Sequence, residues 1–144
     1  MLDNAKTLNS NTVIFKEGDP ADRLVLIKSG QIICLKSSGD KLVPVFLGQN
    51  QDIIGESAMF EEVPYTYSAI ALTSCEVVFI ERQHFTDVFK EAPQWLHDLS
   101  LTMVSRFQST AELLAQNRIV HNLIVDDELF APAKQVEYKK LLSQ

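Results

Sequence analysis

Residues Thr12 to Gly30 read TVIFKEGDPADRLVLIKSG. Two apolar runs, Thr12 to Phe15 and Leu24 to Lys28, flank the turn formers Gly18 to Pro20, and Ser29-Gly30 closes the stretch. Glycine adopts the positive φ that tight turns need, and Asp-Pro favours turning. Short apolar runs rich in β-branched residues between such turns are typical of strands. The stretch therefore predicts two strands joined by a turn.

The same pattern continues as far as Glu81. Further short apolar runs are separated by turn formers that include Gly39 and Gly48, and these runs are Ile32 to Lys36, Leu42 to Leu47, Tyr67 to Leu72 and Glu76 to Ile80. Many short strands at near-regular spacing indicate a sandwich or a barrel. The sequence thus predicts a mainly β protein.

The hydrophobic period changes after Glu81. Gln83 to Phe89 fits a short helix, and Pro93 stands where the first turn of a longer helix would begin. At about 100° per residue, five apolar side chains of the longer helix fall within an arc of roughly 80°. They are Leu96, Leu99, Met103, Phe107 and Leu114. Such a stripe packs either on the barrel or on its counterpart in a second subunit.

The C-terminal segment has a weaker pattern. Asp126 to Glu128 are placed to cap a helix start, Pro132 interrupts the segment, and Lys134 to Leu142 has a weak helical period. We expect a helical tail there.

Composition limits the classes of function. The chain has 144 residues, of which 46% are hydrophobic and 22% charged. It contains no apolar run approaching twenty residues and no N-terminal export signal. We expect one cytoplasmic unit without a membrane segment. A net charge of −6 and a pI near 5.0 disfavour nucleic-acid binding, which needs a clustered cationic face.

Residues capable of chemistry are sparse. Cys34 and Cys75 lie in strand-like runs without metal-ligand spacing, so we expect reduced core thiols, although two such cysteines can also meet within a barrel. His84, His97 and His121 are far apart, and we expect no metal site. The absence of a nucleophile elbow, a phosphate loop and a His-Glu-x-x-His motif predicts a protein without catalytic residues.

Several of these segments, taken in order, resemble the cyclic-nucleotide-binding domain family, which includes catabolite activator proteins and kinase regulatory subunits. They are Thr12 to Gly30, Leu47-Gly48, Asp52 to Glu56, Tyr67 to Ala69, Cys75 to Glu81 and Gln83 to Phe89. The resemblance implies a double-stranded β-helix (jelly-roll) barrel followed by a short and a long helix. It also implies a domain over residues 1–115 and a helical tail over residues 116–144.

In that family, backbone amides and an arginine bind the cyclic phosphate, and a glutamate accepts from the ribose hydroxyl. The resemblance places the candidate ligand-binding residues at Gly55, Glu56, Ser57, Ala58, Tyr67 and Ser68. The arginine is missing. Its place is taken by Tyr67, or by Thr66 when counted from Glu56, and no Lys, Arg or His occurs between Lys41 and Arg82. Such a loss forfeits about one to two powers of ten in affinity.

Three residues of this region have two interpretations each. Glu56 is either a ribose acceptor or a cap for its own short helix. Tyr65 and Tyr67, two apart on one face, either stack on a purine or a partner peptide or pack in the core. Gln51 also stands where the family has a glycine, so the local turn is in question.

Two functional hypotheses follow. The first is a non-catalytic signalling module that has lost its ligand and works through contacts with an unidentified protein partner. The family resemblance favours a homodimer formed by the stripe. The second is a sensor that binds cAMP, cGMP or another small ligand and relays binding through its C-terminal helices. The acidic tail is too short for a DNA-binding winged helix, and we expect no bound cofactor.

Overall fold

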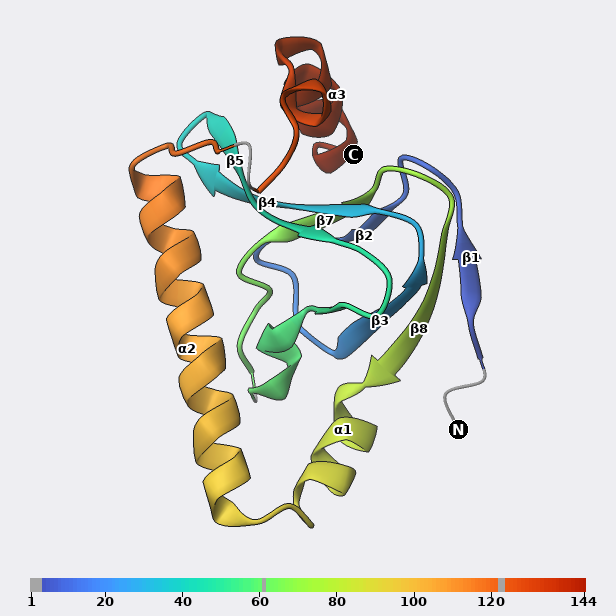
Figure 1. Cartoon of the computed structure of the whole chain (residues 1–144), viewed down its shortest axis with the longest axis vertical. Coiled ribbons are helices and arrows are strands. Elements are labelled where there is room, and N and C mark those ends of the chain that lie inside the picture. Colours follow the sequence, from blue (N-terminus) through green and yellow to red (C-terminus); the bar gives the residue numbers. More distant parts are fainter. Residues whose placement is uncertain (1–3, 61, 122–123) are drawn as a thin grey trace.

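The computed structural model describes residues 4–60, 62–121 and 124–144 (Figure 1). The described residues form two antiparallel sheets and a series of helices. In chain order the elements are β1 (Lys6–Leu8), β2 (Val13–Phe15), β3 (Arg23–Ser29), β4 (Ile32–Ser38), β5 (Lys41–Gly48), β6 (Ile53–Ile54), η1 (Glu56–Met59), β7 (Ser68–Ala71), β8 (Cys75–Glu81), α1 (Arg82–Phe89), α2 (Gln94–Gln116), η2 (Asp127–Phe130) and α3 (Pro132–Leu142).

The two four-stranded sheets face each other and enclose the core. One has the strand order β1-β8-β3-β6, and the other has the order β2-β7-β4-β5. Strands β4 and β5 form a hairpin whose turn includes Gly39 at a φ of +62°, which suits glycine. The mainly β barrel with C-terminal helices that the sequence predicted is confirmed.

Strands β1 and β6 were not predicted. Each is held by a neighbour, since β1 pairs with β8 through Lys6 and Val77, and β6 pairs with β3 through Ile54 and Val25. Lys6–Leu8 contains one apolar residue, and Ile53–Ile54 has only two residues. Segments this short show no period, so only their partner strands define them.

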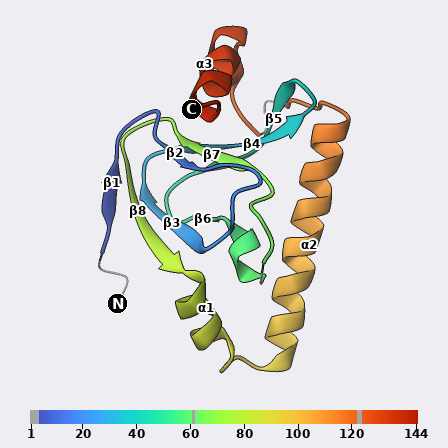
Figure 2. The same ribbon diagram turned by 180° about the vertical axis from the view of Figure 1, so that it is seen from behind.

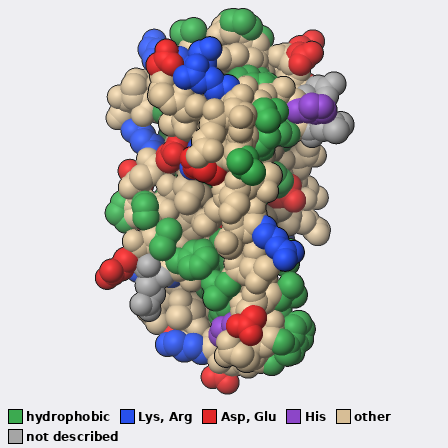
Figure 3. Space-filling model, turned by 90° about the vertical axis from the view of Figure 1, so that its left-hand side faces the viewer, with side chains coloured by type: hydrophobic (Ala, Val, Ile, Leu, Met, Phe, Trp, Pro, Cys, Tyr) green, Lys and Arg blue, Asp and Glu red, His purple; other side chains and the backbone are tan. Residues whose placement is uncertain are grey.

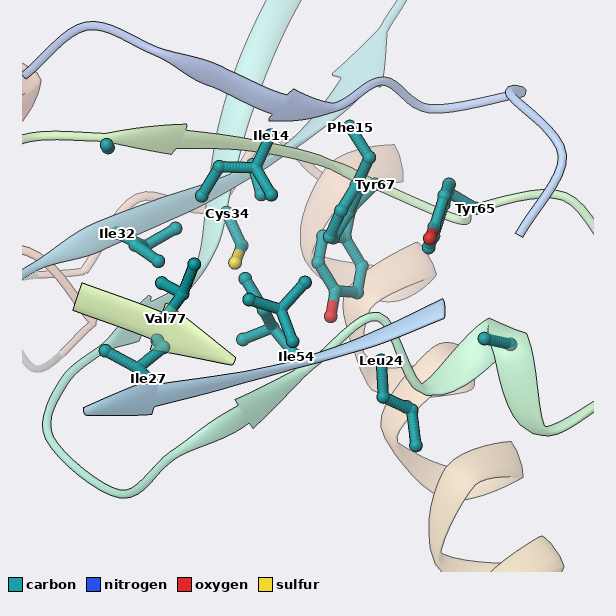
Figure 4. Packing of buried hydrophobic residues seen from close by; sticks show 14 of the residues in the cluster. Ile14, Phe15, Leu24, Ile27, Ile32, Cys34, Ile54, Tyr65, Tyr67 and Val77 are labelled. Atoms are coloured by element: carbon teal, nitrogen blue, oxygen red, sulfur yellow. The ribbon is translucent and has the colours of Figure 1, made fainter. Parts of the chain in front are cut away.

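The barrel interior is filled by apolar side chains from both sheets (Figure 4). Ile27 and Val77 from one sheet meet Ile32 and Cys34 from the other, and all four are fully buried. Both cysteines are buried free thiols. Because the interior is packed, a ligand needs space that side chains do not already fill.

Helix α2 runs along one side of the barrel, and α1 leads to it from β8 (Figures 1 and 2). Val104, Ala111 and Ala115 are buried against the barrel, and Phe107 and Leu114 are partly buried on its core. No helix of the described residues is both long and apolar enough to cross a membrane.

The C-terminal tail covers the outer face of the β2-β7-β4-β5 sheet (Figure 1). Phe130 and Tyr138 pack there on Ile33, Leu35 and Ile70. This cover explains why β4 is apolar at successive positions: one of its faces lines the barrel and the other contacts the tail. Pro132, expected to interrupt the segment, instead occupies the first turn of α3, where its missing N–H is not needed.

Phe130→Ala tests the docking of the tail. The side chain is 6% exposed, so its removal should lower the free energy of unfolding by about 3 kcal/mol in urea denaturation. Val136→Ala is the control, because Val136 lies on α3 with 67% exposure and should change stability by less than about 0.5 kcal/mol. Equal effects of the two substitutions would contradict a docked tail.

Candidate functional site

The candidate site lies where β6 leads into η1. Gly55 joins them at a φ of +83°, and a Cβ there would come within 3.1 Å of the Arg23 carbonyl oxygen. Gln51 adopts a φ of +71° in the preceding turn, where its N–H donates to the Ile27 carbonyl at 2.7 Å. The Asp52 carboxylate accepts from the Gln49 N–H at 2.7 Å. The turn therefore forms without the expected glycine.

The Tyr67 hydroxyl occupies the centre of this site. It accepts from the Gly55 N–H at 2.8 Å and donates to Glu56 Oε2 at 2.6 Å. Its side chain is directed into the barrel, and the residue is 2% exposed (Figure 4). The family resemblance assigns the Glu56 carboxylate to a ligand hydroxyl and the Gly55 amide to a ligand phosphate. Here both groups are hydrogen-bonded to the Tyr67 side chain.

Burial dominates the electrostatics of this pair. Burial raises the pKa of Glu56, while the hydrogen bond from Tyr67 lowers that pKa in part. The pKa of Tyr67 is raised well above its usual value, chiefly by burial. Glu56 Oε1 is buried and has no hydrogen-bond partner among the described residues. The site is therefore short of a donor and is unsuited to an added anion.

Aromatic rings form the wall around Tyr67. Tyr65 stacks on Phe15 with ring centroids 4.0 Å apart, and Tyr67 contacts Phe15 at 5.6 Å. Phe107 of α2 meets Tyr67 edge-on at 5.9 Å. The Tyr65 hydroxyl donates to the Arg23 carbonyl at 2.8 Å. Both tyrosines are thus packed within the barrel, and α2 is part of the same aromatic cluster.

A small cavity remains between the barrel and α2. Its volume is about 230 Å³, and it is lined by Phe46, Ile53, Glu56, Tyr67, Met103, Val104 and Phe107. None of these residues is a cation. Small-molecule sites usually measure about 300 to 1,000 Å³. The free space is therefore smaller than an ordinary ligand pocket and offers no positive charge to a phosphate.

The six candidate ligand-binding residues separate into two groups. Gly55, Glu56 and Tyr67 converge, as described above. Ser57 and Ala58 are buried on η1, where the Ala58 N–H donates to the Gly55 carbonyl at 3.0 Å. The Ser68 hydroxyl accepts from the Glu17 N–H at 2.8 Å and does not line the cavity.

The predicted helix stripe is also divided. Phe107 and Leu114 contact the barrel core, and Leu96 is half-buried. Leu99 and Met103 are 47% and 61% exposed. Trp95 and Leu113, which the sequence prediction did not include, are exposed on the same helix. The exposed apolar surface of α2 is therefore shifted away from the barrel relative to the predicted stripe.

Lys36 is a buried cation that sequence reasoning missed. Its Nζ donates to the Thr66 carbonyl at 2.7 Å and lies 3.4 Å from Glu17 and 3.3 Å from Glu112 of α2. Lys36 precedes the cation-free segment between Lys41 and Arg82 in sequence. Two carboxylates share its charge, and the residue does not line the cavity beside Glu56. Lys36 thus joins β4 to α2, and among the described residues no Lys or Arg lines the cavity.

Known proteins with related sequences include regulators. The family model described as the cyclic nucleotide-binding domain matches residues 5–92. A CRP-like cAMP-activated global transcriptional regulator of Mycobacterium tuberculosis is 28% identical over 104 residues, covering 71% of this chain and 46% of the relative. A cAMP-dependent protein kinase regulatory subunit of Pyricularia oryzae is 31% identical over 74 residues, covering 51% of this chain and 18% of the relative. The chain spans less than half the length of these relatives.

Solved structures share the fold. The cAMP-bound form of the EAL enzyme Bd1971 superposes with a TM-score of 0.68 at 19% identity, covering 76% of this chain and 30% of that one. The catabolite activator protein of Thermus thermophilus gives a TM-score of 0.64 at 20% identity, covering 77% of this chain and 53% of that one. At these identities the likeness concerns the fold alone.

Tyr67→Phe isolates the contribution of the hydroxyl. The variant leaves a buried amide and a buried carboxyl oxygen without their partner, so we expect a loss of about 1–3 kcal/mol in urea denaturation and a further rise in the pKa of Glu56. Tyr65→Phe should cost less, because the one short bond of the Tyr65 hydroxyl is to the Arg23 carbonyl and its contacts with the Arg23 N–H and Asp22 are long, at 3.4 and 3.5 Å. A Tyr67→Phe protein as stable as the wild type would contradict the described bonding.

Proposed function

Because this chain belongs to the cyclic nucleotide-binding domain family, we propose that it is a non-catalytic regulatory member whose ligand site is closed by its own Tyr67. One observation carries the proposal: the Tyr67 hydroxyl bonds both the Gly55 amide and the Glu56 carboxylate. A bound nucleotide would have to displace this side chain. Because Tyr67 contacts Phe15 and Phe107, its displacement would also disturb the barrel core and α2.

Charge opposes nucleotide binding as well. A cyclic phosphate is an anion, and the cavity presents a buried carboxyl without a neighbouring cation. Ionised Glu56 would repel the phosphate in surroundings where water screens poorly. Protonated Glu56 could accommodate the phosphate, but it would not replace the missing arginine contact. Occupied volume and unfavourable charge therefore act in the same direction.

The proposed output is contact with other proteins through α2. Trp95, Leu99, Met103 and Leu113 are exposed along one side of this helix, and we refer to them as the α2 stripe. Figure 3 shows hydrophobic side chains along this side of the molecule. Exposed apolar residues aligned on one helix favour a helical partner. We propose a homodimer through the α2 stripe, with further partners engaged by the dimer.

The second candidate function is a small-ligand sensor. The cavity beside Glu56 favours it, because α2 supplies part of the lining and an occupant would bear directly on that helix. A ligand that prefers one position of α2 would shift the population towards that position. The M. tuberculosis relative is described as cAMP-activated, which makes cyclic nucleotides the first ligands to try.

Calorimetric titration with cAMP and with cGMP separates the two candidates. For the wild-type chain we expect no binding tighter than about 1 mM, since the cavity is small and none of its lining residues is a cation. Tyr67→Ala is the matched variant, because it removes the ring and keeps Gly55 and Glu56. Weak binding gained by the variant would identify the ring as the main obstacle. Micromolar binding to the wild type would contradict closure by Tyr67 and favour the sensor.

A further inference from the structure

Helix α2 carries one arginine, Arg106, and no lysine, and Arg106 lies on the same side of the helix as the apolar residues of the α2 stripe. Leu99 lies at the centre of the α2 stripe, which extends over about 80° from Trp95 and Leu113 to Met103. At about 100° per residue, Met103 lies about 40° to one side of Leu99 and Arg106 about 20° to the other. Arg106 is exposed, and none of the ion pairs among the described residues includes it.

The cavity opens on the Met103 side of α2. Met103 and Phe107 line it from the helix, and Ile53, 55% exposed, lines it from the barrel. At its inner end lies Glu56, whose Oε1 lacks a donor. The cavity thus has apolar walls that lead to a single acceptor, which suits a side chain with an apolar stem and a polar cationic end.

A parallel two-fold dimer brings these two features together. When two α2 helices pack in parallel about an axis along their length, the Met103 side of one faces the Arg106 side of the other. Arg106 and Phe107 are neighbours in sequence, so the arginine arrives at the level of the cavity. The barrels then lie on opposite sides of the helix pair and do not collide, because each barrel is attached through Val104, Ala111 and Ala115.

We infer that, in the homodimer, Arg106 of the partner subunit enters the cavity and donates to Glu56 Oε1, forming two such pairs in each dimer. This inference rests on the proposed dimerisation through the α2 stripe. Charge complementarity selects a second copy as the occupant. An arginine enclosed in an apolar helix interface is costly without a counter-charge, and a buried carboxyl oxygen without a donor is costly in each free chain. Pairing them relieves both costs.

The test combines sedimentation of three single variants with a mixing experiment. Arg106→Gln and Glu56→Gln each remove both charged pairs from a homodimer, and each leaves an uncharged polar side chain in place of the charged one. We expect each to raise the dimer Kd about tenfold or more. Lys90→Gln removes the same charge from a surface ion pair with Asp87 and should dimerise like the wild type. Circular dichroism serves to check that each variant is folded.

Mixing distinguishes a pair between chains from a pair within a chain. A heterodimer of the Arg106→Gln chain with the Glu56→Gln chain regains one Glu56–Arg106 pair, but only if that pair joins two chains. With one chain carrying an affinity tag, we expect the mixed dimer to exceed its statistical share of about half.

The outcomes test the Arg106–Glu56 pair and the proposed dimer separately. A wild-type chain that stays monomeric at every concentration would overturn the proposed dimer itself. A wild-type dimer that neither glutamine variant weakens would leave dimerisation standing and overturn the Arg106–Glu56 pair. Weakened variants that mix at the statistical share would also overturn a pair between chains.

Discussion

The hydroxyl of Tyr67 is the point at which the barrel, the Gly55 turn between β6 and η1, and α2 are joined. It bonds the Gly55 amide and the Glu56 carboxylate, while its ring lies between Phe15 of the barrel and Phe107 of the helix. A buried amide and a buried carboxyl must each find a partner. In this chain the Tyr67 side chain is the partner of both groups.

The need of buried polar groups for hydrogen-bond partners also links the site to the proposed dimer. Glu56 has two oxygens, and Tyr67 satisfies Oε2 alone. The proposed guanidinium of a second chain would satisfy Oε1, which completes the hydrogen bonding of a carboxyl that burial otherwise keeps from water. Assembly, rather than a nucleotide, would then set the ionisation of this group, because a nearby cation favours the charged form.

Local pattern predicted much of this fold. The apolar runs from Val13 to Ile80 and the helical period after Glu81 depend on neighbouring residues, which sequence displays directly. Strands β1 and β6 and the docked tail depend on distant partners, and so they were missed or poorly defined. The site follows the same division. Gly55, Glu56 and Tyr67 were candidates, but the direction of the Tyr67 side chain and the approach of Lys36 to Thr66 arise only from tertiary packing.

The most direct measurement of the central claim is rescue of Tyr67→Ala by phenol. The variant opens a cavity that retains the Gly55 amide and the Glu56 carboxylate, and phenol restores both the ring and the hydroxyl. Millimolar phenol should raise the thermal midpoint of Tyr67→Ala, by more than toluene does, and leave the wild type unchanged. Equal effects of phenol and toluene, or no effect of either on the folded variant, would contradict a site closed by the tyrosine hydroxyl.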